Sequence, residues 1–196
     1  MNAVEQKLAE AVRRRDKIIA PFYKMHSRDG NVVYLDGDSP LCKIFQRVMH
    51  CDTVLNRLST GALLGIDEKI RSPGWWLKDD ILIETDSCTV PGHESLGWFY
   101  VSKADIVLYA VVHEDENGAT CFPIPLTKAR PWFDQHKTEF REQMVENTIN
   151  GRALWTRNLI VPRRRITREL HFEGFILRGG QIVEDFWGKP RMDWLI

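Results

Sequence analysis

The segment CDTVLNRLSTGALLGIDEKI, residues 51–70, constrains the fold of this chain more than any other part of it. Two apolar runs, residues 53–58 and 62–66, lie on either side of the tripeptide Ser59-Thr60-Gly61. Apolar, β-branched runs separated by a short turn-forming segment are typical of a β-hairpin. We therefore predict two antiparallel strands whose turn is centred between Ser59 and Thr60.

The register of this hairpin decides which polar side chains meet. The predicted turn places Asp52 opposite Asp67, and directly opposed residues have Cβ atoms about 4.5–5.5 Å apart. Side chains alternate along a strand, so Lys69 shares a face with Asp67 while Glu68 points to the other face. A slip of one residue would turn Asp52 to the wrong face.

Two carboxylates this close repel each other unless a cation lies between them. Mg²⁺ takes oxygen ligands at about 2.0–2.1 Å and is usually bound by one or two carboxylates with phosphate and water. We predict a Mg²⁺ (or Mn²⁺) site formed by Asp52, Asp67 and the backbone carbonyl of Glu68. Lys69 would orient a water or stabilise negative charge that develops on a phosphate. The alternative is that both acids are ordinary solvated carboxylates at strand ends.

A third acidic residue follows the hairpin. Residues 81–85 are expected to form a strand in which Glu84 is either a third acidic ligand or a group that orders a metal-bound water. The alternative is a surface glutamate at the end of a strand.

The motifs together resemble the PD-(D/E)xK superfamily, the nucleases with a restriction-endonuclease-like fold. Its signature is an Asp early in one strand and (Asp/Glu)-x-Lys on the next strand. Small members from phages and mobile elements add a strand ending in Glu, a Gly-Trp segment and a Ser-x-Ala-Asp segment. The matching residues are Asp52, Asp67, Lys69, Glu84, Gly97-Trp98 and Ser102-Lys103-Ala104-Asp105.

The resemblance implies an α/β fold with a restriction-endonuclease-like core, a central mixed β-sheet with an antiparallel hairpin, flanked by helices. It implies catalytic roles for Asp52, Asp67, Lys69 and Glu84, and DNA as the substrate. Some members use an upstream helical glutamate, for which Glu5 and Glu10 are equal candidates. Cys51 stands where the proline of the family name would be. We expect residues 1–165 to form the nuclease-like domain and residues 166–196 a C-terminal extension packed on it.

Composition sets limits on the function. Apolar residues make up 43% and charged residues 28% of the chain, which is typical of a soluble globular protein. No apolar run approaches the roughly 20 residues of a membrane span. The four cysteines form no CxxC pair, so we expect reduced thiols and a cytoplasmic protein. The net charge of zero argues against binding of polyanions over the whole surface.

Basic charge is concentrated near the C-terminal end. Four arginines within VPRRRITREL are candidates for contacts to a nucleic-acid backbone, because arginine pairs well with phosphate. The alternative is a solvated basic cluster. The four are Arg163, Arg164, Arg165 and Arg168.

Other elements follow from periodicity and turn signals. We expect a helix over residues 2–18 that is closed by Pro21, and a strand over 31–35. Residues 41–50 fit either a helix or a strand. Further along, residues 105–113 and 120–126 are predicted to be paired strands, followed by a helix over residues 127–147.

Two functions remain open at this point. The first is a Mg²⁺-dependent nuclease acting on DNA. The second is a catalytically silent nuclease-fold module that binds nucleic acid or a host or phage protein. Intact acids and lysine favour the first, whereas the modest net charge favours the second. Whether the chain acts alone, as a homodimer or with a protein partner is left open.

Overall fold

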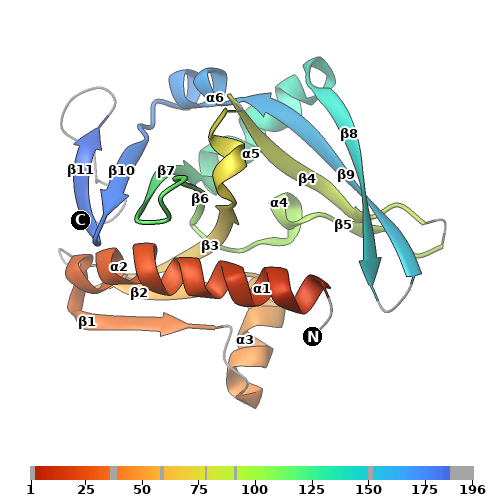
Figure 1. Ribbon diagram of the computed structural model, residues 1–196. Coiled ribbons are helices and arrows are strands. Elements are labelled where there is room, and N and C mark those ends of the chain that lie inside the picture. Colours follow the sequence, from red (N-terminus) through yellow and green to blue (C-terminus); the bar gives the residue numbers. More distant parts are fainter. Residues whose placement is uncertain are drawn as a thin grey trace. The chain divides into compact units, whose positions relative to one another are not determined.

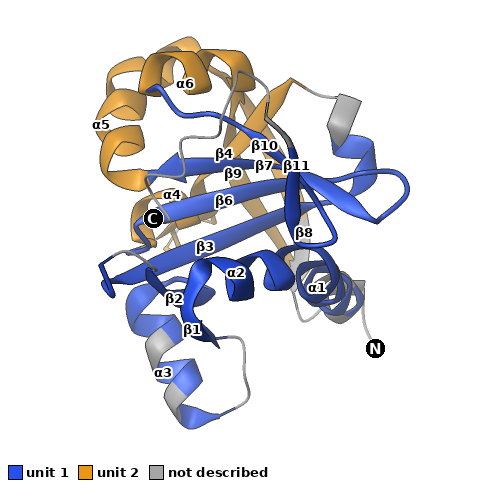
Figure 2. Cartoon of the chain, turned by 90° about the vertical axis from the view of Figure 1, so that its left-hand side faces the viewer, with its two compact units in different colours: residues 1–78, 103–125, 171–196 blue, residues 79–102, 126–170 orange. Residues whose placement is uncertain are grey.

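The computed structural model describes residues 3–35, 39–57, 60–77, 79–90, 92–149 and 152–185. The chain has an α/β fold and divides into two compact units, each built from separate segments (Figure 2). Unit 1 comprises residues 1–78, 103–125 and 171–196, and unit 2 comprises residues 79–102 and 126–170.

Unit 1 contains a seven-stranded mixed sheet (Figure 1). All neighbouring strands are antiparallel except β3 and β6, which run parallel. The sheet therefore has the mixed character and the antiparallel hairpin that the sequence predicts. Its strands, in spatial order, are β1 (Ser27–Tyr34), β2 (Thr53–Arg57), β3 (Leu63–Arg71), β6 (Ile106–Val112), β7 (Gly118–Pro125), β10 (Phe175–Arg178) and β11 (Gln181–Asp185).

The β2–β3 hairpin has the predicted register. Thr53 pairs with Ile66 and Leu55 with Leu64, which places Asp52 opposite the next residue of β3. The apolar side chains of these pairs are fully buried, because they face the core of the unit. β3 extends well beyond the partner residues of β2, since β6 pairs with its other edge as far as Arg71.

A long helical segment precedes the sheet. It consists of α1 (Ala3–Arg14), the π-helical η1 (Arg15–Ile19) and α2 (Ala20–His26). The expectation that Pro21 closes the helix is wrong. Pro21 lies in the first turn of α2, where a missing N–H costs little. Ile18, Ile19, Phe22 and Tyr23 from this segment belong to the main core of unit 1, with Leu55 and other sheet residues.

The ambiguous segment before the hairpin is a helix, α3 (Pro40–Met49). The Ser39 side chain accepts a hydrogen bond from the Cys42 N–H at 3.1 Å, which is a typical N-cap. His50 ends the helix in the left-handed conformation. This ending brings the chain directly into the residues that precede β2.

Unit 2 contains a second sheet, in the order β5-β4-β9-β8. The predicted third strand belongs to this sheet as β4 (Asp80–Cys88), and it pairs with β5 (Ser95–Leu96) and β9 (Arg152–Pro162). Its helices are α4 (Trp98–Val101), α5 (Leu126–His136) and α6 (Arg163–Leu170), and a short turn, η3 (Lys137–Glu139), follows α5.

The expectation of one helix over residues 127–147 is wrong in its second half. α5 ends at His136, and residues Arg141–Ile149 form β8, which pairs with β9 along its whole length. The antiparallel pairing with β9, the next strand in the sequence, overrides the local helix propensity of this segment. The division into residues 1–165 and 166–196 stays a prediction. Its boundary falls inside α6, and β10 beyond it pairs with β7.

None of the helices in the described part of the chain is long and apolar enough to cross a membrane. The four cysteines are free thiols, and three of them are buried.

Gly97 lies directly against the backbone of β4. Its N–H donates to the Thr85 carbonyl at 2.8 Å, and a Cβ at Gly97 would overlap the Glu84 carbonyl oxygen. Since both groups are backbone, Gly97→Ala requires a shift of β4. We expect this substitution to lower the free energy of unfolding by about 1–3 kcal/mol, measured by urea denaturation. Gly74→Ala is the control, because no atom lies within 4 Å of a Cβ there. Equal stabilities of the two variants would contradict this packing argument.

Candidate functional site

The site is centred on Asp52, the residue before β2. Its N–H donates to the Ile66 carbonyl at 2.9 Å, and its carboxylate oxygen Oδ2 accepts the Glu68 N–H at 2.7 Å. The Asp67 side chain is buried, and the Lys69 ammonium contacts its Oδ1. The structure therefore brings together the two acids and the lysine that the sequence singles out.

The surroundings of Asp52 disfavour its charged form. Burial raises the pKa of Asp52 above its ordinary value, and the negative charge of Asp67 raises it further. The Lys69 ammonium and the Glu68 N–H oppose this rise. The charged form of Asp52 is therefore less favourable here than it is in water.

The backbone carbonyl of Glu68 also points toward Asp52. In a strand, the N–H and C=O of one residue point to the same edge. The Glu68 N–H points to Asp52, and no residue of β2 pairs with β3 beyond Ile66. The Glu68 carbonyl is therefore turned to the Asp52 side of β3.

This oxygen set fits a hard divalent cation. The described residues contain no group of three or more His, Cys, Asp or Glu side chains arranged to hold a metal. A metal at this position would therefore be held by two carboxylates and one backbone carbonyl. Its remaining ligands would be water or a substrate phosphate.

The Glu68 side chain lies on the opposite face of β3. It accepts a hydrogen bond from the Thr53 hydroxyl at 2.7 Å. Burial raises its pKa to about 7, against the effect of the Thr53 hydrogen bond and of the nearby Arg15 charge. Arg15 itself is buried, pairs with Asp16 at 2.9 Å and lies over the Tyr34 ring. Sequence reasoning missed this group behind the hairpin, because its members come from a helix and a strand far from residue 68.

Asp105 fixes β3 to β6 beside the site. Its N–H donates to the Gly65 carbonyl, and its Oδ2 accepts the Gly65 N–H, each at 2.9 Å. This reciprocal pair gives a structural role to the Ala104-Asp105 segment of the sequence motif. Cys51 lies beside the acids but is buried, and its pKa is raised to about 11 chiefly by that burial. Cys51 is therefore a neutral thiol and not a nucleophile at neutral pH.

The remaining candidate acids are less informative. Glu84 lies within β4 of unit 2, where it pairs with Asn158, and its role as an accessory acid stays a prediction. Glu10 forms an ion pair with Arg14 at 2.6 Å on α1. The side chain of Glu5, the other upstream candidate, lies outside the described part of the structure.

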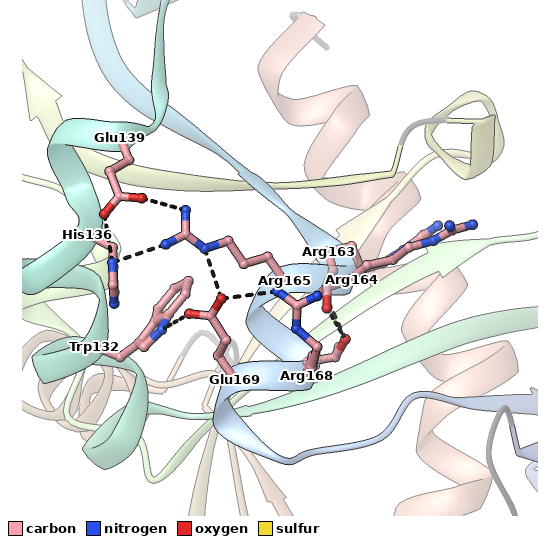
Figure 3. Close-up of polar contacts among 9 residues, drawn as sticks. Trp132, His136, Glu139, Arg163, Arg164, Arg165, Arg168 and Glu169 are labelled. Carbon is pink, nitrogen blue, oxygen red and sulfur yellow. Dashed lines mark hydrogen bonds and ion pairs between the residues drawn. The ribbon is translucent and has the colours of Figure 1, made fainter.

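The four arginines of the basic tract differ in their contacts with acidic side chains (Figure 3). Arg165 forms ion pairs with Glu139 at 2.8 Å and with Glu169 at 3.1 Å, and its guanidinium lies 5.3 Å from the centre of the Phe140 ring. Arg163 pairs with Asp79 at 3.1 Å. Both side chains therefore hold α6 to the rest of unit 2.

Arg164 and Arg168 differ from these two. Their side chains are 90% and 76% exposed and make only long ion pairs, at 3.4 and 3.3 Å. They lie one helical turn apart on α6, so they share a face. Contact with a nucleic-acid backbone stays a prediction for the tract, and these two arginines are the members that are accessible for it.

Comparisons with family models, with curated proteins and with solved structures give no match to this chain.

The raised pKa of Glu68 predicts a pH-dependent stability. A carboxyl whose pKa is higher in the folded state destabilises the fold when it ionises. The fold of the wild type therefore loses stability as the pH rises from about 4.5, the ordinary pKa of a glutamate, to about 7. We expect Glu68→Gln to gain thermal stability relative to the wild type across this interval, measured in the presence of EDTA. Glu114→Gln, an exposed turn residue, should follow the wild type. Parallel curves for Glu68→Gln and wild type would contradict the burial of an ionisable group here.

The different contacts of Arg165 and Arg164 predict different effects on stability. Arg165→Ala removes two ion pairs and the contacts with Phe140, so its melting temperature should fall. Arg164→Ala removes an exposed side chain and should leave the melting temperature nearly unchanged. Differential scanning calorimetry checks both. A larger loss for Arg164→Ala than for Arg165→Ala would overturn the assignment.

Proposed function

We propose that this chain is a Mg²⁺-dependent (or Mn²⁺-dependent) nuclease of the PD-(D/E)xK type that hydrolyses DNA phosphodiester bonds. The observation that carries the proposal is the β2–β3 register. It sets Asp52 opposite Asp67 and puts Lys69 on the same face of β3. Burial, and to a smaller extent the charge of Asp67, raise the pKa of Asp52, and a cation between the two carboxylates would oppose both effects.

Each residue has a distinct role in the proposed reaction. The carboxylates of Asp52 and Asp67 and the carbonyl of Glu68 would hold the metal. When bound, the metal polarises the phosphate and lowers the pKa of a water ligand. Lys69 is placed to orient the attacking water or to stabilise charge on the phosphate oxygens. The water oxygen bonds to phosphorus, the bond from phosphorus to the leaving oxygen breaks, and that oxygen takes up a proton.

The Asp52 carboxylate must be held in one orientation for this role. The Glu68 N–H performs this task through its hydrogen bond to Oδ2. The same peptide segment supplies the Glu68 carbonyl, so two of the proposed ligands are fixed by a single stretch of β3. Preorganisation of this kind lowers the cost of binding a metal and a substrate.

The second candidate function is a catalytically silent nuclease-fold module that binds nucleic acid or a protein partner. The contact between Lys69 and Asp67 favours it, because an internal ion pair partly neutralises the acid without any metal. The absence of a third metal-binding side chain among the described residues points the same way. The two functions differ in whether metal-dependent cleavage depends on these side chains.

Substitution of the site residues tests the proposal. We expect Asp67→Asn and Lys69→Ala to reduce Mg²⁺-dependent cleavage of plasmid and linear DNA by about 10²-fold or more, because each removes charge that acts in the transition state. Glu114→Gln removes an exposed carboxylate and should retain full activity. Cleavage is measured on gels with Mg²⁺, Mn²⁺ or EDTA.

Cleavage that persists in both site variants would exclude this site as the centre of the reaction. A wild-type protein that cuts no DNA or RNA with either metal would favour the silent module. Thermal melting of each variant distinguishes loss of chemistry from loss of fold.

A further inference from the structure

A further cation lies on the face of β3 that carries the proposed site. Arg71 is the last residue of β3, and alternation along the strand puts its side chain on the same face as Asp67 and Lys69. Residues two apart in a strand are separated by roughly 6.6 Å. Arg71 therefore continues the row that begins with the acid and the lysine.

Two aromatic rings fix the Arg71 guanidinium. Its Nε donates to the Tyr109 hydroxyl at 3.1 Å, and its central carbon lies 5.1 Å from the centre of that ring and 5.5 Å from that of Trp75. Tyr109 is only 1% exposed and is the β6 partner of Lys69. A buried residue next to the proposed catalytic lysine thus holds this arginine in place.

The charge of Arg71 is not neutralised within the described part of the chain. No carboxylate there forms an ion pair with it, and its only side-chain hydrogen bond to the described residues is the one from Nε. Other arginines of unit 1 do have acidic partners: Arg14 pairs with Glu10 and Arg178 with Asp115. A half-buried guanidinium without an anion is costly unless a ligand supplies the negative charge.

The chemistry of such a group selects its ligand. Guanidinium Nη groups form a planar fork that matches two oxygens of a phosphate, and this bidentate geometry distinguishes arginine from lysine. With Nε bound to Tyr109, the Nη groups remain for such a ligand. We propose that Arg71 binds a backbone phosphate of the nucleic acid, next to the phosphate at Asp52 and Asp67. The position of the second phosphate rests on the proposed function, whereas the phosphate-binding role of Arg71 does not.

Binding measurements test this role independently of cleavage. We would measure the anisotropy of fluorescein-labelled duplex and single-stranded DNA in EDTA over a range of salt concentrations. Arg71→Gln should weaken binding about tenfold. It should also reduce the slope of log affinity against log salt concentration by about one. Arg71→Lys should restore the salt dependence but only part of the affinity, because lysine keeps the charge and loses the fork.

Two further variants separate this role from a structural one. Tyr109→Phe keeps the buried ring but removes the acceptor for Nε, so we expect a loss of affinity of about two- to threefold. Arg28→Gln is the control, since Arg28 is exposed and lies beside Gly61 at the turn end of the hairpin. It removes the same charge and should bind as the wild type does. Melting temperatures show whether each variant is folded.

The outcomes separate the two proposals. Weakened binding by Arg71→Gln, with no cleavage by the wild type, would support the role of Arg71 and refute the nuclease. Cleavage by the wild type with unchanged binding and KM in Arg71→Gln would overturn the role of Arg71 alone. Absence of any nucleic-acid binding by the wild type, or equal losses in Arg71→Gln and Arg28→Gln, would also overturn it.

Discussion

Two hydrogen bonds between Asp52 and the main chain of β3 fix the rest of the proposed site. One joins its N–H to Ile66 at 2.9 Å, and the other joins its carboxylate to the Glu68 N–H at 2.7 Å. Together they set the acid against a single stretch of β3, and the burial of Leu64 and Ile66 prevents a slip. A shift of one residue would expose both apolar side chains and bury Lys69. The energy that holds the site therefore comes from the hydrophobic core.

The acids on the two faces of β3 have different partners. On one face, Asp67 is in contact with Lys69. On the other face, Glu68 is bound by Thr53 and has a pKa near 7, which the charge of Asp52 helps to raise. A proton on Glu68 near neutral pH reduces the repulsion that Asp52 experiences. Glu68 and Asp52 are thus coupled electrostatically across β3.

The predictable part of this structure is the part encoded by neighbouring residues. The hairpin register followed from its turn and its apolar runs, and with it the meeting of Asp52 and Asp67. The role of Pro21 does not follow from the sequence, because proline can end a helix or stand in its first turn. The core contacts of Phe22 show that the helix continues past Pro21. The strand β8 is not predictable in this way, because the residues of this segment fit a helix and only its pairing with β9 makes it a strand. Arg15 and Tyr109 were not found, since sheet pairing and helix packing bring them to β3 from distant segments.

The arginines show why sequence clusters are a poor guide to binding in a neutral chain. The tract at residues 163–168 is the densest basic run near the C-terminal end, yet Arg165 is engaged by Glu139 and Glu169. Arg71 has no basic neighbour closer than Lys69, but its guanidinium is held by two rings and has no acidic partner among the described residues. With no net charge, long-range attraction of a polyanion is weak. Affinity for phosphate then has to come from a few cations that are fixed in place and lack internal partners, and Arg71 meets both conditions.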